Sequence, residues 1–200
     1  PRVARKSFHL LPRVAERRKE MSIHIKEVTE KEKDFYHNLR HEYFVKRKKL
    51  YDENNFDSYD VLSSTKHYVI HNDRELVGVF RLITGSDLSA LNNIKNFPSK
   101  RCVEFSRLII TDKCPVTRLE LLRFLYDFCI VNRFEYIIGE ALDEELCRAF
   151  KRVFSKSMTF FGKVKIKDPN ISQSEDKFCY PIMINITTIS ENPIFKKLGK

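Results

Sequence analysis

The sequence predicts an α/β fold of the α+β sandwich type, in which a mixed central sheet is flanked by helices. Apolar runs typical of strands and segments with helical periodicity follow one another along 200 residues. A long amphipathic segment separates the fourth and fifth predicted strands, which favours a right-handed crossover between parallel neighbours. The fourth of these strands, residues 102–111, carries charged side chains within an apolar run, and we expect the molecule to be organised around it.

The first half of the chain predicts one strand, one helix and a hairpin. Thr29-Glu30-Lys31-Glu32 has the form of a capping box, with Thr29 at the N-cap and Glu32 at N3, so it indicates where the helix begins. We expect that helix to run to about Tyr51, and a polar, Asn-rich loop to follow it. The predicted elements are a strand at 22–28, the helix at 30–51, the loop at 52–60, and strands at 66–70 and 75–84 around a turn at 71–74.

The second half predicts the central strand, two helices and three further strands. Pro115 suits the first turn of a helix, where its missing N–H costs nothing, and Asp143 suits an N-cap. The predicted elements are a loop at 85–101, strands at 102–111 and 135–141, helices at 115–132 and 143–154, and strands at 159–166 and 178–186.

Composition predicts one cytoplasmic domain, residues 21–200, preceded by a basic arm, residues 1–20. Hydrophobic residues make up 42% of the chain, and no apolar run approaches the roughly 20 residues that span a bilayer. The five cysteines form no C-x-x-C pair, which favours reduced thiols and argues against a zinc site. The arm has seven Lys or Arg and two Glu, and so carries half of the net charge of +10.

This charge suits an acidic partner. Nucleic acid, an anionic lipid surface and an acidic protein all attract such a chain. The sequence has no helix-turn-helix, zinc finger or aromatic RNA-binding motif, so we favour an acidic protein and expect no nucleic acid.

The central strand is the first candidate for a functional site. Strict alternation would place Glu104 and Ser106 on one face, and Phe105 and Arg107 on the other. The charged pair either serves the fold as an ion pair or faces a cleft, where Glu104 accepts a proton from an amine.

Four polar motifs occur in a fixed order. They are Arg40-x-x-x-Phe44, Phe56-Asp57-x-Tyr59-Asp60, Gly78-x-x-Arg81 and Glu104-x-Ser106-Arg107. Over residues 22–165 they resemble the autoinducer synthase group of GNAT N-acyltransferases, which contains acyl-homoserine lactone synthases and N-acyl amino acid synthases. The sequence Val-Glu-Phe-Ser-Arg-Leu and the lack of tryptophan are more similar to the N-acyl amino acid synthases.

The resemblance implies a set of site residues. We expect Glu104, Ser106 and Arg107 to act in catalysis. Arg107 and Arg81 can each hold a carboxylate by paired hydrogen bonds, whether of Glu104, of Asp57 or Asp60, or of the substrate. The residues expected to bind substrate are Arg40, Phe44, Asp57, Asp60, Arg81 and Phe105, and further phenylalanines, among them Phe97 and Phe150, either line an acyl tunnel or fill the core.

The donor is predicted from a missing loop. GNAT enzymes that use acyl-CoA carry Arg/Gln-x-x-Gly-x-Gly/Ala after the fourth strand, where backbone N–H groups hold the pyrophosphate. The segment Thr111–Arg118 has no glycine. This indicates an acyl group on the phosphopantetheine of acyl carrier protein, with no other cofactor and no metal. The cations expected to dock this acidic carrier are Arg118, Arg123, Lys151 and Arg152.

The predicted function is transfer of a long-chain fatty acyl group from acyl carrier protein to the amine of an amino acid. One alternative is an acyl-homoserine lactone synthase that uses S-adenosylmethionine. A second alternative is a basic module that binds nucleic acid or a membrane surface without catalysis. A small-molecule acetyl-CoA transferase is disfavoured by the missing loop.

Overall fold

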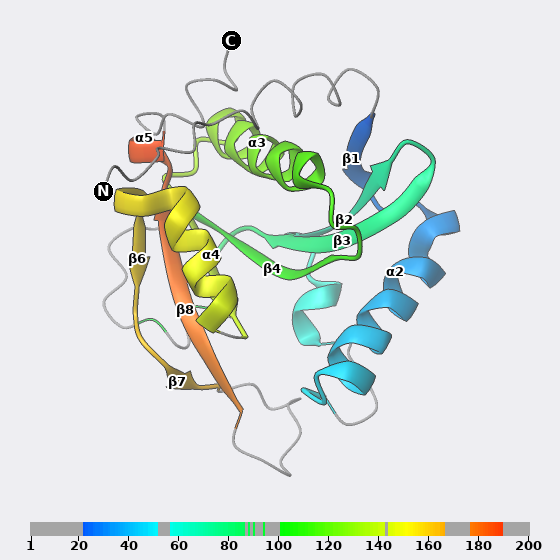
Figure 1. The fold of residues 1–200 in the computed structure, drawn as a ribbon, viewed down its shortest axis with the longest axis horizontal. Coiled ribbons are helices and arrows are strands. Elements are labelled where there is room, and N and C mark those ends of the chain that lie inside the picture. The colour runs from blue at the N-terminus through cyan, green and yellow to red at the C-terminus, as the bar shows by residue number, and fades with distance from the viewer. Residues whose placement is uncertain are drawn as a thin grey trace, which may run out of the picture.

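A computed structural model describes residues 22–51, 57–86, 88, 90, 94, 101–142, 144–166 and 177–189 (Figure 1). The basic arm, Phe97 and the Asp143 cap lie outside the described residues, as does most of the loop before the last strand. No helix in this part of the chain is both long and apolar enough to cross a membrane.

The centre of the molecule is one mixed sheet. Its order is β1-β2-β3-β4-β5-β8-β6, with β7 paired to β8, and every pair is antiparallel except β4–β5. The parallel pair is the predicted crossover. The strands are β1 (Ile23–Glu27), β2 (Thr65–Asn72), β3 (Glu75–Ile83), β4 (Cys102–Ile110), β5 (Tyr136–Ala141), β6 (Met158–Phe160), β7 (Val164–Lys165) and β8 (Phe178–Asn185).

Helical segments connect these strands. The predicted capping box is present, because the Thr29 hydroxyl donates to Glu32 and the two backbone–side-chain bonds of the motif are made. The segments are η1 (Glu30–Glu32), α2 (Lys33–Arg40), the π-helical η2 (His41–Arg47), η3 (Ser58–Val61), α3 (Pro115–Val131), α4 (Glu144–Phe154), η5 (Ser155–Ser157) and α5 (Ile186–Ile189).

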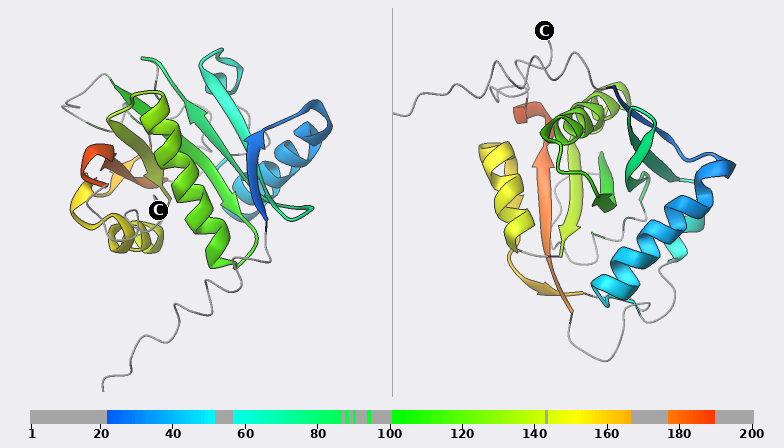
Figure 2. Two further views of the ribbon diagram at one scale, coloured as in Figure 1. Left: turned by 90° about the horizontal axis from the view of Figure 1, so that it is seen from above. Right: turned by 45° about the vertical axis from the view of Figure 1, so that its right-hand side comes forward.

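The helices cover both faces of the sheet (Figure 2). Alternating residues of β2 and β3 are divided between two cores, since Val69 and Val79 pack with α2 whereas Ile70 and Phe80 pack with α3. Phe154 of α4 belongs to the α3 core, so α3 and α4 share a face.

The predicted residue boundaries of two elements are wrong. The strand expected at 159–166 is divided into β6 and β7, and Gly162 between them has φ +84°, outside the range of a strand. The first helix ends at Arg47 rather than near Tyr51, and its last turns are π-helical. The short segments η3 and α5 were not predicted.

Candidate functional site

The site begins where β4 and β5 separate. The two strands pair from Cys102↔Tyr136 to Glu104↔Ile138, and β4 then continues to Ile110 without β5 beside it. Gly139 lies at the point of separation, where an added Cβ would come within 2.6 Å of the Phe105 carbonyl oxygen. A side chain there would push the strands apart, so glycine permits their close approach at the base of the gap.

A bulge in β4 turns Arg107 toward the site. The pairing with β3 shifts register between Val79 and Arg81, and Arg107 has φ +58°. An extra residue on one strand interrupts alternation. The prediction that Arg107 faces away from Glu104 and Ser106 is therefore wrong, because its guanidinium reaches the same Asp57 carboxylate that Arg81 binds.

Three arginines and three carboxylates form a buried cluster beside the gap. Arg40 donates to both oxygens of Asp60, at 2.8 and 2.9 Å. Arg81 donates from Nη1 to Asp57 Oδ1 at 2.7 Å and to Asp60 Oδ1 at 2.8 Å, and its Nη2 lies 4.0 Å from Glu104 Oε1. Arg107 Nη2 completes the cluster at 2.5 Å from Asp57 Oδ2. The formal charges of these six side chains cancel.

The arginines of the cluster keep the carboxylates of Asp57 and Asp60 ionised. Burial alone would raise the pKa of Asp60, but hydrogen bonds and charge from Arg40, together with the charge of Arg81, outweigh it and hold that pKa well below its ordinary range. The pKa of Asp57 is lowered too, because Arg81 and Arg107 outweigh its burial.

His67 supports the cluster from β2. Burial is the main reason that its pKa is lowered, so the ring is neutral near pH 7. Its Nε2 lies 3.2 Å from the Asp60 carbonyl oxygen, which can only accept, so this nitrogen carries the proton. The opposite nitrogen then accepts from the Tyr36 hydroxyl at 2.8 Å.

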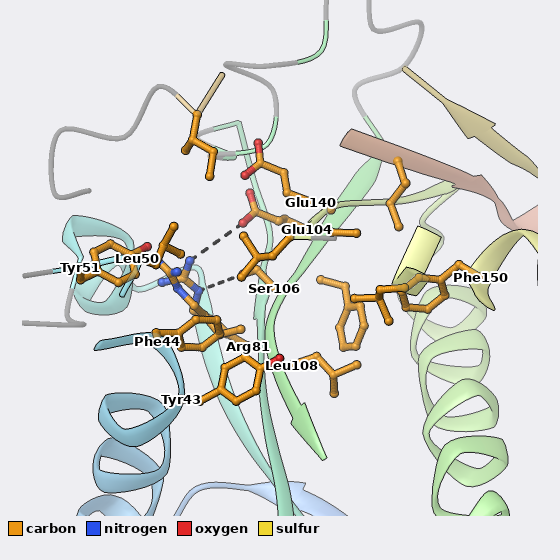
Figure 3. Close-up of a pocket in the computed structure, with 18 residues that line it drawn as sticks. Tyr43, Phe44, Leu50, Tyr51, Arg81, Glu104, Ser106, Leu108, Glu140 and Phe150 are labelled. Atoms are coloured by element: carbon orange, nitrogen blue, oxygen red, sulfur yellow. Dashed lines mark hydrogen bonds and ion pairs between the residues drawn. The ribbon is translucent and has the colours of Figure 1, made fainter. Parts of the chain in front are cut away.

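A pocket of about 120 Å³ opens in the gap between the strands (Figure 3). Glu104 is almost fully buried, and its Oε2 accepts from the Ala90 backbone N–H at 2.9 Å. Arg81 Nε donates to Ser106 Oγ at 3.1 Å, so the same arginine orients both side chains. The lining residues are Tyr43, Phe44, Leu50, Tyr51, Arg81, 104–108, 139–142, Leu146, Phe150, Ile166 and Ile182.

An apolar cavity adjoins this pocket. Phe105, Gly139, Phe150 and Ile182 line both spaces. The inner cavity lies between α3, α4 and the sheet, and its other walls are Leu122, Leu125, Tyr126, Ile137, Ile138, Phe154, Ile184 and Ile189. The pocket that Glu104 lines thus adjoins a small apolar space of about 20 Å³ between the helices and the sheet.

The structure divides the predicted residues into three groups. Those expected in the pocket and found on its wall are Phe44, Arg81, Glu104, Phe105, Ser106 and Arg107. Arg40, Asp57 and Asp60 do not line it but lie in the buried cluster, and their role in substrate binding stays a prediction. Arg118 and Arg123 on α3, and Lys151 and Arg152 on α4, are exposed.

Sequence reasoning missed a second carboxylate in the pocket. Glu140 lies near Glu104 in Figure 3, and it accepts a hydrogen bond from the Cys179 thiol. The signal that identified Glu104, a charge within an apolar strand, was also present at Glu140. Among the described residues, no group of three or more metal-ligating side chains could hold a metal ion, and all five cysteines are free thiols.

No family model matches the sequence, and no curated protein matches it. Solved structures do match its fold. FeeM, an N-acyl amino acid synthase from uncultured soil microbes, gives a TM-score of 0.65 at 9% identity, covering 88% of this chain and 99% of FeeM. BjaI, a CoA-dependent acyl-homoserine lactone synthase, gives 0.63 at 19% identity, covering 90% of each chain. LasI, an acyl-homoserine lactone synthase, gives 0.57 at 20% identity, covering 83% of this chain and 90% of LasI.

These likenesses confirm the predicted fold. The chain has a GNAT-like mixed sheet flanked by helices, the fold of the autoinducer synthase group that the four motifs resemble.

Proposed function

We propose that the protein is an N-acyltransferase that moves a long-chain fatty acyl group from acyl carrier protein to the amine of an amino acid. The single observation that carries the proposal is the position of Glu104, a buried carboxylate on a pocket that adjoins a small apolar cavity. The likeness of the fold to FeeM, BjaI and LasI adds support, because these are N-acyl amino acid and acyl-homoserine lactone synthases.

The chemistry follows from these positions. The amine nitrogen attacks the thioester carbonyl, the C–N bond forms, and the C–S bond then breaks as the carrier thiol leaves. Glu104 accepts the proton that the amine must lose, directly or through a water, and the thiolate is protonated on release. In this proposal, backbone N–H groups at the point where β4 and β5 separate stabilise the oxyanion.

The segment before α3 supports a donor without a nucleotide. Pro115 is the first helical residue and has no N–H to offer a phosphate. The Asp112 carboxylate lies beside it, accepting from Thr117 Oγ1 at 2.6 Å and from Asn72 Nδ2 at 3.3 Å. A diphosphate at this helix terminus would meet a negative charge of the protein itself, whereas a carrier-borne phosphopantetheine lacks that diphosphate.

The test compares one acyl chain on two donors, with the products identified by mass spectrometry. We expect an N-acyl amino acid, and faster turnover with acyl carrier protein than with acyl-CoA. Equal or better use of acyl-CoA would overturn the donor assignment, and BjaI is described as a CoA-dependent synthase. An acyl-homoserine lactone formed from S-adenosylmethionine would favour the lactone synthase alternative. The likeness of the fold to LasI is the observation that supports this alternative.

A further inference from the structure

A second hollow lies outside the pocket, between η2 and the end of β4. This groove has a volume of about 460 Å³. One wall comes from the helical layer and the other from the strand that leads to α3. Its lining residues are Leu39, Glu42, Tyr43, Lys46 and Arg47, with Ile109, Ile110 and Thr111 opposite.

The groove and the pocket share one wall. Tyr43 lines both, and Figure 3 shows its ring beside Leu108 at the edge of the pocket. Along β4, residues 104–108 line the pocket, and Ile109, Ile110 and Thr111 line the groove. The two spaces therefore follow one another along the same strand. An extended arm lying against the free edge of β4 would pass from the groove to Glu104.

The rim of the groove is basic where Lys46 and Arg47 line it. Four consecutive cations, Lys46-Arg47-Lys48-Lys49, end the first helical layer, and Lys46, Arg47 and Lys49 are exposed. Arg47 and Lys48 stand over the Tyr43 ring, 5.8 and 5.7 Å from its centroid. The one acidic residue of the groove, Glu42, is paired with Lys46.

The α3 cations have local partners, as Lys46 of the rim has in Glu42. Arg118 donates to the Cys114 and Asp112 carbonyl oxygens, and Arg123 lies 3.8 Å from Asp127. The basic rim of η2 differs from them because it borders a hollow that shares Tyr43 with the pocket that holds Glu104.

We propose that this rim, Lys46 to Lys49, docks the acidic surface of the acyl carrier protein, and that the groove admits its phosphopantetheine arm past Tyr43. The proposal rests on the proposed function and names the docking surface of that same site. Charge complementarity selects an acidic protein, and an entrance that continues to Glu104 selects one that carries its substrate on a flexible arm.

The experiment uses the full chain and one acyl group on two donors, acyl carrier protein and acyl-pantetheine. The variant is Lys46→Glu/Arg47→Glu. Its control is Lys31→Glu/Arg74→Glu, which makes the same change in net charge at exposed positions, with Lys31 at the opposite end of the α2 layer. We expect the ratio of kcat/KM for the carrier to kcat/KM for acyl-pantetheine to fall about tenfold in the variant, and its salt dependence to weaken. The control keeps the wild-type ratio, and melting temperatures establish that each variant is folded.

Each remaining outcome has a distinct meaning. An unchanged ratio in the folded variant, or an equal fall in the control, overturns the docking surface while leaving the transferase intact. Wild-type protein that turns over neither donor refutes the proposed function itself. Loss of binding to anionic vesicles or DNA by the variant, with carrier turnover unchanged, would assign the rim to a membrane surface or nucleic acid and overturn the proposal.

Discussion

Arg40 and Asp60 meet through two parallel hydrogen bonds, and neither side chain is accessible to solvent. The arginine belongs to α2 and the aspartate to η3, so the pair joins these two helical segments. Asp60 also accepts from Arg81, which orients Ser106 and lies near Glu104. The pair thus supports β4, the strand that carries Glu104 and Ser106, from outside the pocket.

We expect Arg40→Met to destabilise the protein by about 3–5 kcal/mol, because Asp60 would keep its charge without its main partner. Urea unfolding followed by circular dichroism measures the change. Lys33→Met is the matched control, since Lys33 pairs with Glu30 in solvent and its loss should cost below about 1 kcal/mol. Similar losses of unfolding free energy in the two variants would show that the buried cluster stabilises the fold no more than an exposed ion pair does.

Acid should unfold the protein through the same cluster. The pKa values of Asp57 and Asp60 are lower in the folded chain than in the unfolded one, so the folded state binds fewer protons. Their stabilisation is complete above the ordinary aspartate pKa of about 3.9 and is lost as pH falls below it. Glu32, whose pKa is lowered to about 2 by hydrogen bonds that outweigh its burial, adds to this trend.

The check is the free energy of unfolding between pH 7 and pH 3. Wild-type protein should lose stability steeply below pH 4, and Asp60→Asn should give a shallower acid limb from a lower starting value. Parallel curves for the two proteins would mean that Asp60 does not titrate with unfolding.

Glu104→Gln should lower kcat by roughly 10²-fold or more while the protein stays folded, because the amide keeps the shape but removes the base. Glu140→Gln is the control, since this second carboxylate lines the same pocket. Steady-state rates and melting temperatures of both variants test the assignment. A larger loss for Glu140→Gln would transfer the role of base to Glu140.

Leu125→Phe should shift the preferred donor toward shorter acyl chains, because Leu125 lines the inner cavity. Leu121→Phe is the control, as Leu121 is buried on the same helix but does not line that cavity. Both substitutions should cost about 1–3 kcal/mol from overpacking. Competition between long and short acyl donors is the readout, and an equal change of preference in both variants would argue against an acyl-binding cavity.

Local signals predicted much of the fold and part of the site. The Thr29–Glu32 capping box is a contact over three residues, so the sequence could place it. Glu104 and Arg81 were identified because burying a charge within an apolar strand costs free energy unless the charge is paired. The orientation of Arg107 was not predictable, because its bulge depends on how β4 pairs with β3. The burial of Arg40 likewise depends on an aspartate 20 residues away.

The neutrality of the six-residue cluster limits how relatives of this chain can diverge. A single substitution of Arg40, Arg81, Arg107, Asp57 or Asp60 by an uncharged residue leaves one buried charge without compensation. In evolution, these positions should therefore be substituted in pairs of opposite charge or remain unchanged. In an alignment of relatives, Asp57 and Asp60 are both expected to vary little, because each accepts hydrogen bonds from two arginines.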